Sequence, residues 1–329
     1  MIWGWTKEEL SDEQIKAQGW SGVQNMLRTM EYDSTEKKIK TFPIPELKNL
    51  RASHLVSTRS LALSGSAPTP VAESINATLH HEIIVTFTLS SVEPFDGTKY
   101  YSEDTAPEFG VMFRGSSDFK KYTSVSVKMP VATGAPTAQS AQDTVYAPIK
   151  MFPSPATSPE ANCSAECTKE RTCISWTYTS SPSPTCALYW KTSERVHNSV
   201  AQSGTVNIPQ LYMDRVASGS IGSIEPLMGR APLKQKNAGV VQLHIYVDDS
   251  VVEVFKDGGL ETITGRLYLP DGEAQTHIGL YTKNLDHVTV TASVDVYAMG
   301  TVWAADKGAG ANRAYTNSLY NLIGSVASK

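Results

Sequence analysis

The stretch that decides the fold is LHIYVDDSVVEVFKDGGLETITGRLYLP, residues 243–270. From 241 to 248, aliphatic residues alternate with polar or aromatic ones, which is the period-2 pattern of a strand with one buried face. The turn sequences Asp248-Asp249-Ser250 and Lys256-Asp257-Gly258-Gly259 flank a resumed alternation at 252–254. The stretch therefore predicts an antiparallel meander whose aliphatic side chains share one face.

Two other segments show the same one-sided alternation. In residues 83–89 and 288–296 every second residue is apolar, and the residues between them are mostly polar; the apolar members are Ile83, Val85, Phe87, Leu89, Val288, Val290, Ala292, Val294 and Val296. Strands with one apolar face bury it when two antiparallel sheets pack together. The sequence therefore predicts an all-β protein, an antiparallel two-sheet β-sandwich with little helix.

Composition fits a globular protein and argues against several classes of function. The chain has 329 residues, of which 40% are hydrophobic and 19% charged, and its net charge is −4. Because it has no basic block, nucleic acid is not an expected partner. No run of about 18 apolar residues is present, so no membrane span is expected. The histidines cluster only at His80-His81, and we expect neither a metal site nor a cofactor.

The meander closely resembles the signature of the C-terminal β-sandwich of glycoside hydrolase family 32, the invertases, inulinases and fructan hydrolases. Residues 279–282 and 294–303 resemble the closing strands of that family. Residues 213–215, followed by Ser218-Gly219, and residues 109–112 resemble earlier strands. The resemblance implies a jelly-roll-like sandwich over residues 49–305.

The beginning of the chain resembles a different part of the same family. Ile2-Trp3-Gly4-Trp5-Thr6-Lys7-Glu8 and Gly19-Trp20-Ser21-Gly22-Val23-Gln24 are similar to the last propeller blade of invertases. Residues 1–48 are therefore expected to be a blade remnant and linker. We expect residues 306–329 to be a C-terminal tail, in which Tyr315, Leu319, Leu322, Ile323 and Val326 predict one apolar helical stripe.

Proline-rich, polar connectors set apart a further unit within the sandwich. Residues 130–142 and 153–160 have this composition, and we expect residues 130–208 to form a small insert between two sandwich strands. Insertions at exposed loop tips are tolerated because the entropy of loop closure grows slowly with length.

The catalytic motifs of family 32 do not occur in this sequence. The family places its carboxylates in Asn-Asp-Pro-Asn, Arg-Asp-Pro and Glu-Cys-Pro, whereas the nearest match here is Glu166-Cys167-Thr168. No catalytic residue is therefore assigned. The resemblance implies the C-terminal part of a β-fructofuranosidase-like hydrolase, non-catalytic as this chain, whose complete parent hydrolyses sucrose or fructans. The alternative is a stand-alone β-sandwich module that binds carbohydrate or protein.

Two residues are singled out beyond these motifs. Trp20 matches a tryptophan that lines the sugar subsite of the family, and an indole face stacks well on the apolar face of a sugar. Trp3 and Trp5 are expected to pack inside the blade. Glu253 alternates with core-facing Val252 and Val254, so it is expected to face outward as a structural residue at a strand edge.

All four cysteines fall between residues 163 and 186, at positions 163, 167, 173 and 186. Their spacing does not match a zinc site. Sequence alone allows three pairings, or four reduced thiols. The segment 162–191 resembles the core of a PAN/Apple module, and that resemblance implies the disulfides Cys163–Cys186 and Cys167–Cys173. It also implies an insert that binds protein or carbohydrate; the alternative is an elaborated loop without a partner. Two disulfides indicate an oxidising compartment.

Two N-glycosylation sequons, at Asn76 and Asn162, favour the same compartment. We therefore expect a secreted, extracellular or vacuolar protein, although no signal peptide is visible. Expected partners are a fructose-containing carbohydrate, through the parent enzyme, and either a propeller domain or a second copy of the chain. Residues 1–48 are expected to need such a neighbour, because blade strands leave unpaired edges.

Overall fold

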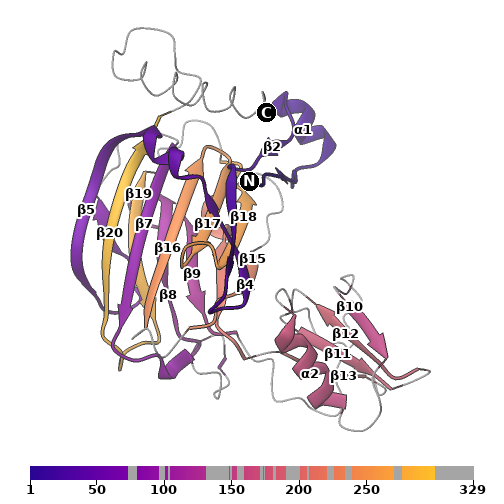
Figure 1. Cartoon of the computed structure of the whole chain (residues 1–329). Helices are drawn as coiled ribbons and strands as arrows, with labels where there is room; N and C mark the ends of the chain where they lie inside the picture. Colours follow the sequence, from indigo (N-terminus) through magenta and orange to yellow (C-terminus); the bar gives the residue numbers. More distant parts are fainter. Residues whose placement is uncertain are drawn as a thin grey trace.

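The computed structural model describes residues 1–72, 80–95, 101–102, 104–130, 148, 150–153, 159–170, 173, 175–180, 183–189, 201–205, 207–220, 226–233, 239–269 and 276–300. Two six-stranded antiparallel sheets lie face to face and form the body of the molecule (Figure 1). An N-terminal segment packs against the outer face of one sheet, and a smaller unit with its own four-stranded sheet stands outside the sandwich.

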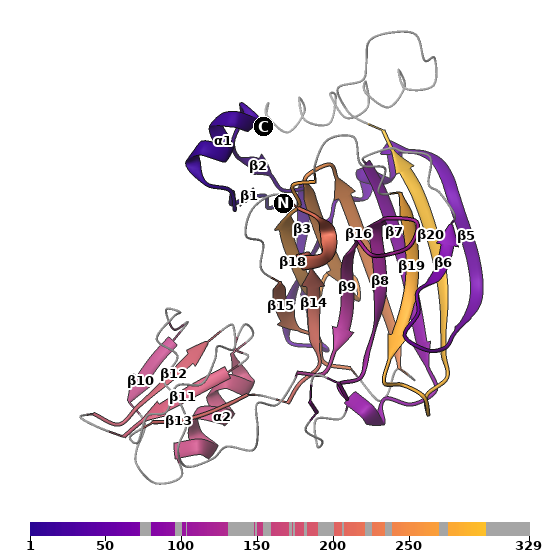
Figure 2. The ribbon, with the colours of Figure 1, turned by 180° about the vertical axis from the view of Figure 1, so that it is seen from behind.

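The first sheet has the order β15-β14-β9-β8-β19-β6 and lies on the near side in Figure 2. Its strands are β6 (Thr69–Ala72), β8 (Glu108–Gly115), β9 (Thr123–Lys128), β14 (Gln210–Asp214), β15 (Leu227–Arg230) and β19 (His277–Lys283). The second sheet has the order β18-β17-β16-β7-β20-β5. Its strands are β5 (Arg51–Leu63), β7 (His80–Leu89), β16 (Val240–Asp248), β17 (Val251–Lys256), β18 (Glu261–Arg266) and β20 (Val290–Met299). Short 3₁₀ helices lie at η2 (Glu93–Phe95) and η3 (Val216–Ser218).

The core lies between the two sheets and consists of the aliphatic faces predicted from the alternation. Val85 of β7 is paired with Leu243 on one side and with Val294 on the other, and all three are fully buried. The rings of Phe87 and Phe109 meet edge to face across the sheets with centroids 5.0 Å apart. Burying each such side chain contributes about 1.5–3 kcal/mol. The predicted all-β, two-sheet sandwich is confirmed.

The meander forms as its turn sequences predict. Asp249 adopts a φ of 48° between β16 and β17, a left-handed conformation that aspartate tolerates. In the β17–β18 turn, Asp257, Gly258 and Gly259 have φ angles of 48°, 68° and 89°. A Cβ atom at Gly259 would lie 2.0 Å from the carbonyl oxygen of Thr41, so only glycine permits the N-terminal segment to approach this turn.

The opposite face of the second sheet is also buried in part, which the alternation does not predict. His244, Tyr246 and Glu253 point away from the core, yet they are only 5%, 3% and 2% exposed. They lie beneath a hairpin made of β3 (Arg28–Asp33) and β4 (Lys38–Pro43). Expecting the strands of the meander to be half-buried was therefore wrong at these positions, because a segment distant in sequence covers the outward face.

The remaining N-terminal elements are β1 (Trp5–Thr6), α1 (Asp12–Gln18), β2 (Val23–Gln24) and η1 (Pro45–Leu50). Helix α1 is unexpected in a segment predicted to consist of blade strands. Its capping box is formed by Ser11 and Gln14, and Gly19 ends it in a left-handed conformation with a φ of 82°. These caps satisfy backbone groups at both ends of the helix and so stabilise a helix of only 7 residues.

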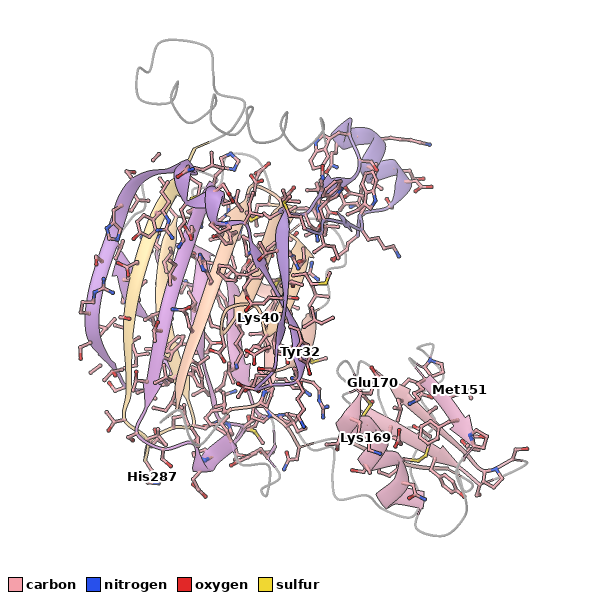
Figure 3. The ribbon with its side chains drawn as sticks, in the orientation of Figure 1. Tyr32, Lys40, Met151, Lys169, Glu170 and His287 are labelled. Carbon is pink, nitrogen blue, oxygen red and sulfur yellow. A yellow bond between two sulfur atoms is a disulfide. The ribbon has the colours of Figure 1, made fainter. Side chains whose placement is uncertain are left out.

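The insert contains β10 (Lys150–Pro153), α2 (Pro159–Lys169), β11 (Ser175–Thr179), β12 (Thr185–Tyr189) and β13 (Ala201–Thr205), with the sheet order β10-β12-β11-β13. Its small core consists of the four cysteines with Trp176, Tyr178 and Leu188, against which Phe152 packs. In Figure 3, Lys169 and Glu170 lie on the side of the insert that faces the sandwich, and Met151 lies on the far side. The insert leaves the sandwich after Lys128 of β9 and returns before Gln210 of β14, and these two residues are register partners.

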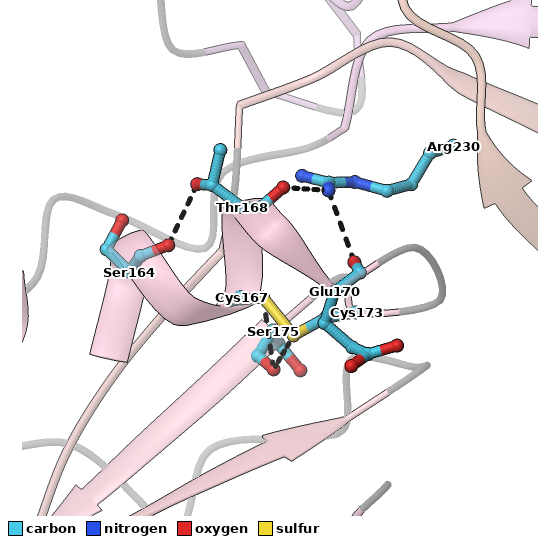
Figure 4. Close-up of a disulfide and its surroundings, with 7 residues drawn as sticks. All are labelled: Ser164, Cys167, Thr168, Glu170, Cys173, Ser175 and Arg230. Atoms are coloured by element: carbon cyan, nitrogen blue, oxygen red, sulfur yellow. Dashed lines mark hydrogen bonds between the residues drawn. A yellow bond between two sulfur atoms is a disulfide. The ribbon is translucent and has the colours of Figure 1, made fainter. Parts of the chain in front are cut away.

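Arg230, at the end of β15, links the sandwich to the insert (Figure 4). It is 8% exposed, and its Nη1 donates to the carbonyl oxygen of Thr168 and, at 3.2 Å, to that of Glu170. The last carbonyls of a helix lack partners within the helix and carry partial negative charge. Arg230 therefore caps the C-terminal end of α2 with a positive charge.

We expect Arg230→Ala to loosen the insert while leaving the sandwich core intact. The substitution removes charge-assisted hydrogen bonds of the kind that contribute about 1.5–3 kcal/mol. The amides of Glu170 and Cys173, which bond to Glu166 and Glu170, should exchange with deuterium faster, whereas those of β7 should not change. Arg59→Ala, at an exposed arginine of β5, is the matched control. Unchanged exchange at Glu170 in Arg230→Ala would contradict the capping role.

Candidate functional site at the junction of the N-terminal segment and the sandwich

Charged and aromatic side chains of the described chain concentrate where the N-terminal segment, residues 1–50, meets the second sheet. Three groups of contacts make this junction. They centre on Glu253, on Glu82 and on the pair Arg215 and Arg266. In each group a nearly buried charge on the sandwich meets a partner from the segment or from the start of β5.

Glu253 is the first centre. Its carboxylate is ion-paired with Arg28 and accepts the backbone N–H of Met26 at 2.6 Å. Arg28 also donates to Thr264 at 2.9 Å, and its guanidinium lies 4.7 Å from the centroid of the Phe255 ring. Burial raises the pKa of Glu253, and the nearby charge of Arg28 opposes that increase only in part. Glu253 does face away from the core, but placing it at a strand edge was wrong, because β17 is an interior strand and the hairpin covers the carboxylate.

Glu82 is the second centre and is fully buried. Arg51 donates two hydrogen bonds to its carboxylate, from Nε to Oε2 at 2.6 Å and from Nη2 to Oε1 at 2.8 Å. The Tyr246 hydroxyl donates to Oε1 at 3.0 Å, and His244 Nε2 bonds to the same oxygen. Phe42 of β4 packs on the His244 ring with centroids 5.1 Å apart, which closes the network under the hairpin. Burial by itself would raise the pKa of Glu82, but the bonds from Arg51 and His244 outweigh it and lower the pKa to about 2.

Two buried arginines form the third centre, at the end of β18. Arg215 donates to Glu9 at 2.8 Å, and Arg266 is ion-paired with Glu8 at 3.2 Å. Tyr268 joins both glutamates, because its hydroxyl donates to Glu8 at 2.5 Å and accepts the backbone N–H of Glu9 at 3.0 Å. Burial, together with the bond to Glu8, raises the pKa of Tyr268 to about 12, so the phenol stays protonated and continues to donate.

Trp20 lies beside this third centre. The Arg266 guanidinium is 5.1 Å from the centroid of its ring, and the tryptophan is 45% exposed. The structure thus leaves part of the indole accessible, as a sugar-stacking role requires. Trp3 and Trp5 are 63% and 84% exposed, so the described residues of this chain do not supply the packing expected for them inside a blade.

A cavity of about 430 Å³ lies beside the hairpin, lined by charged and apolar side chains. The charged residues are Glu36 and Lys38 from the N-terminal segment and Lys256, Asp257 and Glu261 from the meander. Lys38 is paired with Glu261 at 2.9 Å, and Lys256 is paired with Asp257. Two ion pairs, Lys38 with Glu261 and Lys256 with Asp257, therefore line this cavity.

The other residues predicted from the sequence lie elsewhere. The cysteines lie in the insert, where Cys163 is bonded to Cys186 and Cys167 to Cys173, the pairing that the PAN/Apple resemblance implies. Asn162 lies in helix α2, next to the buried Cys163, which is an unfavourable setting for a glycan. Asn76 and the apolar stripe of the tail fall outside the described residues.

The junction is suited to holding two parts of the chain together. Glu82 and Glu253 are each bonded to an arginine, which keeps both carboxylates occupied. Among the residues that the structure describes, no group of three His, Cys, Asp or Glu side chains is arranged to hold a metal ion. No helix in the described part of the chain has the length and apolar character needed to cross a membrane.

Glu82→Gln should destabilise the protein most at neutral pH. A carboxylate whose pKa is lowered in the folded state stabilises that state above its unfolded pKa, and this stabilisation is lost as the pH falls through the folded pKa. The shift from the usual value of 4.5 to about 2 corresponds to roughly 3 kcal/mol. In urea unfolding, the difference between wild type and variant should therefore be large at pH 7 and shrink from pH 4.5 towards 2. Exposed Glu31→Gln serves as the control, and a pH-independent difference for Glu82→Gln would contradict the network.

Arg28 and Glu253 should be strongly coupled in a double-mutant cycle. Arg28→Met leaves a buried carboxylate without its cation, and breaking a buried pair in this way costs about 3–5 kcal/mol. Adding Glu253→Gln should recover part of that loss, giving a coupling energy of about 1–3 kcal/mol in urea unfolding at pH 7. Additive single effects would show that the hairpin is held on the sheet by other contacts.

Comparisons with known proteins agree with this architecture. The sequence model described as glycosyl hydrolases family 32 C terminal matches residues 46–298. The insoluble isoenzyme 1 of β-fructofuranosidase from Daucus carota is 34% identical over 97 residues, covering 29% of this chain and 16% of the relative. The extracellular exo-inulinase of Aspergillus awamori is 32% identical over 96 residues, covering 29% and 17%.

The fold is also found in a solved structure. Fructan 1-exohydrolase IIa from Cichorium intybus superposes on 91% of this chain with a TM-score of 0.55 and 15% identity, and the match covers 45% of that enzyme. The chain therefore spans less than half the length of the relatives it matches. Since the family model covers most of the sequence, from η1 to the end of β20, the chain belongs to glycosyl hydrolase family 32 and carries its C-terminal domain.

Proposed function

We propose that this chain is the non-catalytic C-terminal part of a β-fructofuranosidase-like hydrolase, in which the sandwich supports a catalytic propeller. The observation that carries the proposal is the family match over residues 46–298. The curated relatives include a β-fructofuranosidase and an exo-inulinase, so the complete parent is assigned to the hydrolysis of sucrose or fructans.

The N-terminal segment favours this arrangement over an independent sandwich. The segment exposes large apolar side chains at Met1, Ile2, Trp3 and Trp5, while its other side is ion-paired to the second sheet. Exposed apolar surface next to polar contacts marks an interaction site. The proposed partner of this apolar surface is the remainder of the propeller. The junction is then the place where the sandwich binds the last blade.

The chemistry of the carboxylates agrees with a non-catalytic role. A retaining glycosidase needs two carboxyl groups about 5–5.5 Å apart, one as nucleophile and one as acid and base. The three family motifs that supply them are absent from the sequence. The buried carboxylates at the junction, Glu82 and Glu253, are committed to Arg51 and Arg28.

The proposal extends to the compartment and to the insert. The two disulfides, together with a relative named as extracellular, favour a secreted or vacuolar protein. The helix that carries Cys163 and Cys167, followed by a strand and the Cys186 strand, supports assigning the insert as a PAN/Apple-like unit.

Trp20 is assigned a sugar-stacking role in the complete parent, because its indole remains partly exposed.

The purified chain should release no fructose from sucrose, inulin or levan. The reason is the absence of the nucleophile and acid motifs, and the measurement is fructose release against a blank without protein. A family 32 propeller domain supplied in trans should bind the chain in size-exclusion chromatography. Hydrolysis by the chain alone would overturn the non-catalytic assignment. Binding of inulin by the chain alone, with no binding to a propeller, would favour the stand-alone module instead.

A further inference from the structure

Arg266 has an unusual environment for a buried cation. It is 0% exposed, and none of its three guanidinium nitrogens has a hydrogen-bond partner among the described residues. It is held instead by the ion pair with Glu8 at 3.2 Å and by two aromatic rings. The guanidinium carbon lies 4.9 Å from the centroid of the Tyr268 ring and 5.1 Å from that of Trp20.

The loop that carries Trp20 is fixed on both sides of the tryptophan. Gln18 donates from Nε2 to the carbonyl oxygen of Trp20 at 2.8 Å. The backbone N–H of Gly22 donates to Glu8 Oε1 at 2.8 Å, the same carboxylate oxygen that is paired with Arg266. Glu8 therefore joins the Trp20 loop to the sandwich arginine, and the ring of Trp20 itself meets that arginine.

A planar guanidinium beside an indole is attracted by the ring electrons, most strongly where water is excluded. A lysine has no plane to lay on the ring, and an apolar side chain has no charge to pair with Glu8. Both properties of arginine are thus used at this position. The ring is held near a fixed cation while the tryptophan remains 45% exposed.

We propose that Arg266 of the sandwich is a positioning residue for Trp20, fixing the indole for stacking on a fructose-containing carbohydrate. The sugar part of this inference rests on the proposed function. The positioning of Trp20 by Arg266 does not depend on it. Through Arg266 the C-terminal domain contributes to substrate binding without touching the substrate. Tyr268 and Glu8 complete the support, because the Tyr268 hydroxyl donates to Glu8 at 2.5 Å.

The test is the indole N–H signal of Trp20 in the full chain, recorded by ¹⁵N NMR. The sequence has six tryptophans, and Trp20→Phe identifies the signal by its loss. In Arg266→Met the Trp20 signal should move, because the ring loses the cation that lies 5.1 Å from its centroid. Arg266→Lys, which keeps the charge, should restore part of the shift.

Lys38→Met is the matched control. It removes another ion pair between the N-terminal segment and the sandwich, Lys38 with Glu261, which does not involve the Trp20 ring. The Trp20 signal should stay at its wild-type position in this variant. If Arg266→Met does not fold, Glu8→Gln probes the same support from the segment, and it should shift the Trp20 signal in the same direction.

A wild-type Trp20 signal in folded Arg266→Met, or in Glu8→Gln, would overturn the inference, as would an equal shift in Lys38→Met. The sugar is tested separately by titrating 1-kestose into the wild-type chain bound to a family 32 propeller domain whose nucleophile has been replaced. A Trp20 response to 1-kestose that weakens in Arg266→Met supports the complete proposal. Movement of Trp20 in the variant with no response to 1-kestose in the wild type would refute the sugar role and leave the positioning established.

Discussion

A carboxylate removed from water needs a cation or several hydrogen-bond donors, and this constraint determines how the chain is assembled. The outward face of the second sheet carries Glu82 and Glu253, and the edge strand β18 of the same sheet carries Glu261. All three glutamates are between 0% and 4% exposed. Their cationic partners are Arg51, Arg28 and Lys38, all from the N-terminal segment or its junction with β5. The sheet face and the segment therefore form one structural unit, although they are far apart in sequence.

Glu82 and Glu253 show that the number of donors decides how a buried carboxylate behaves. Both are buried, and burial favours the protonated form in each. Glu82 receives two bonds from Arg51, one from His244 and one from Tyr246, so its pKa falls. Glu253 has one arginine and one backbone N–H, which do not compensate its burial, so its pKa rises. Their contributions to stability consequently change in opposite directions as the pH falls.

The sequence predicts the inward faces well, because a period of two in aliphatic residues is a local signal. Val241, Leu243 and Ile245 lie in the core as expected. It does not predict that His244 and Tyr246 are buried too, because their cover comes from a hairpin more than two hundred residues earlier. Glu82 was missed for the same reason, since nothing near it in sequence indicates Arg51 or His244 as a partner.

The sequence predicts the remaining features to different degrees. The disulfide pairing followed from resemblance, since spacing alone left three possibilities. Helix α1 had a recognisable signal in Ser11, Gln14 and Gly19, which the resemblance to blade strands obscured. The contact between Arg266 and Trp20 had no local signal, because it joins residues that are far apart in the sequence.

The position of the insert has a consequence for how this family can diversify. Lys128 and Gln210 are neighbours across two paired strands, so the insert occupies the place of an ordinary hairpin turn. Directly opposed residues in antiparallel strands lie about 4.5–5.5 Å apart. Any independently stabilised unit whose ends lie that close could replace the present one without changing the register of the sheet. The pairing of β9 with β14 thus fixes the sandwich independently of what is inserted between the two strands.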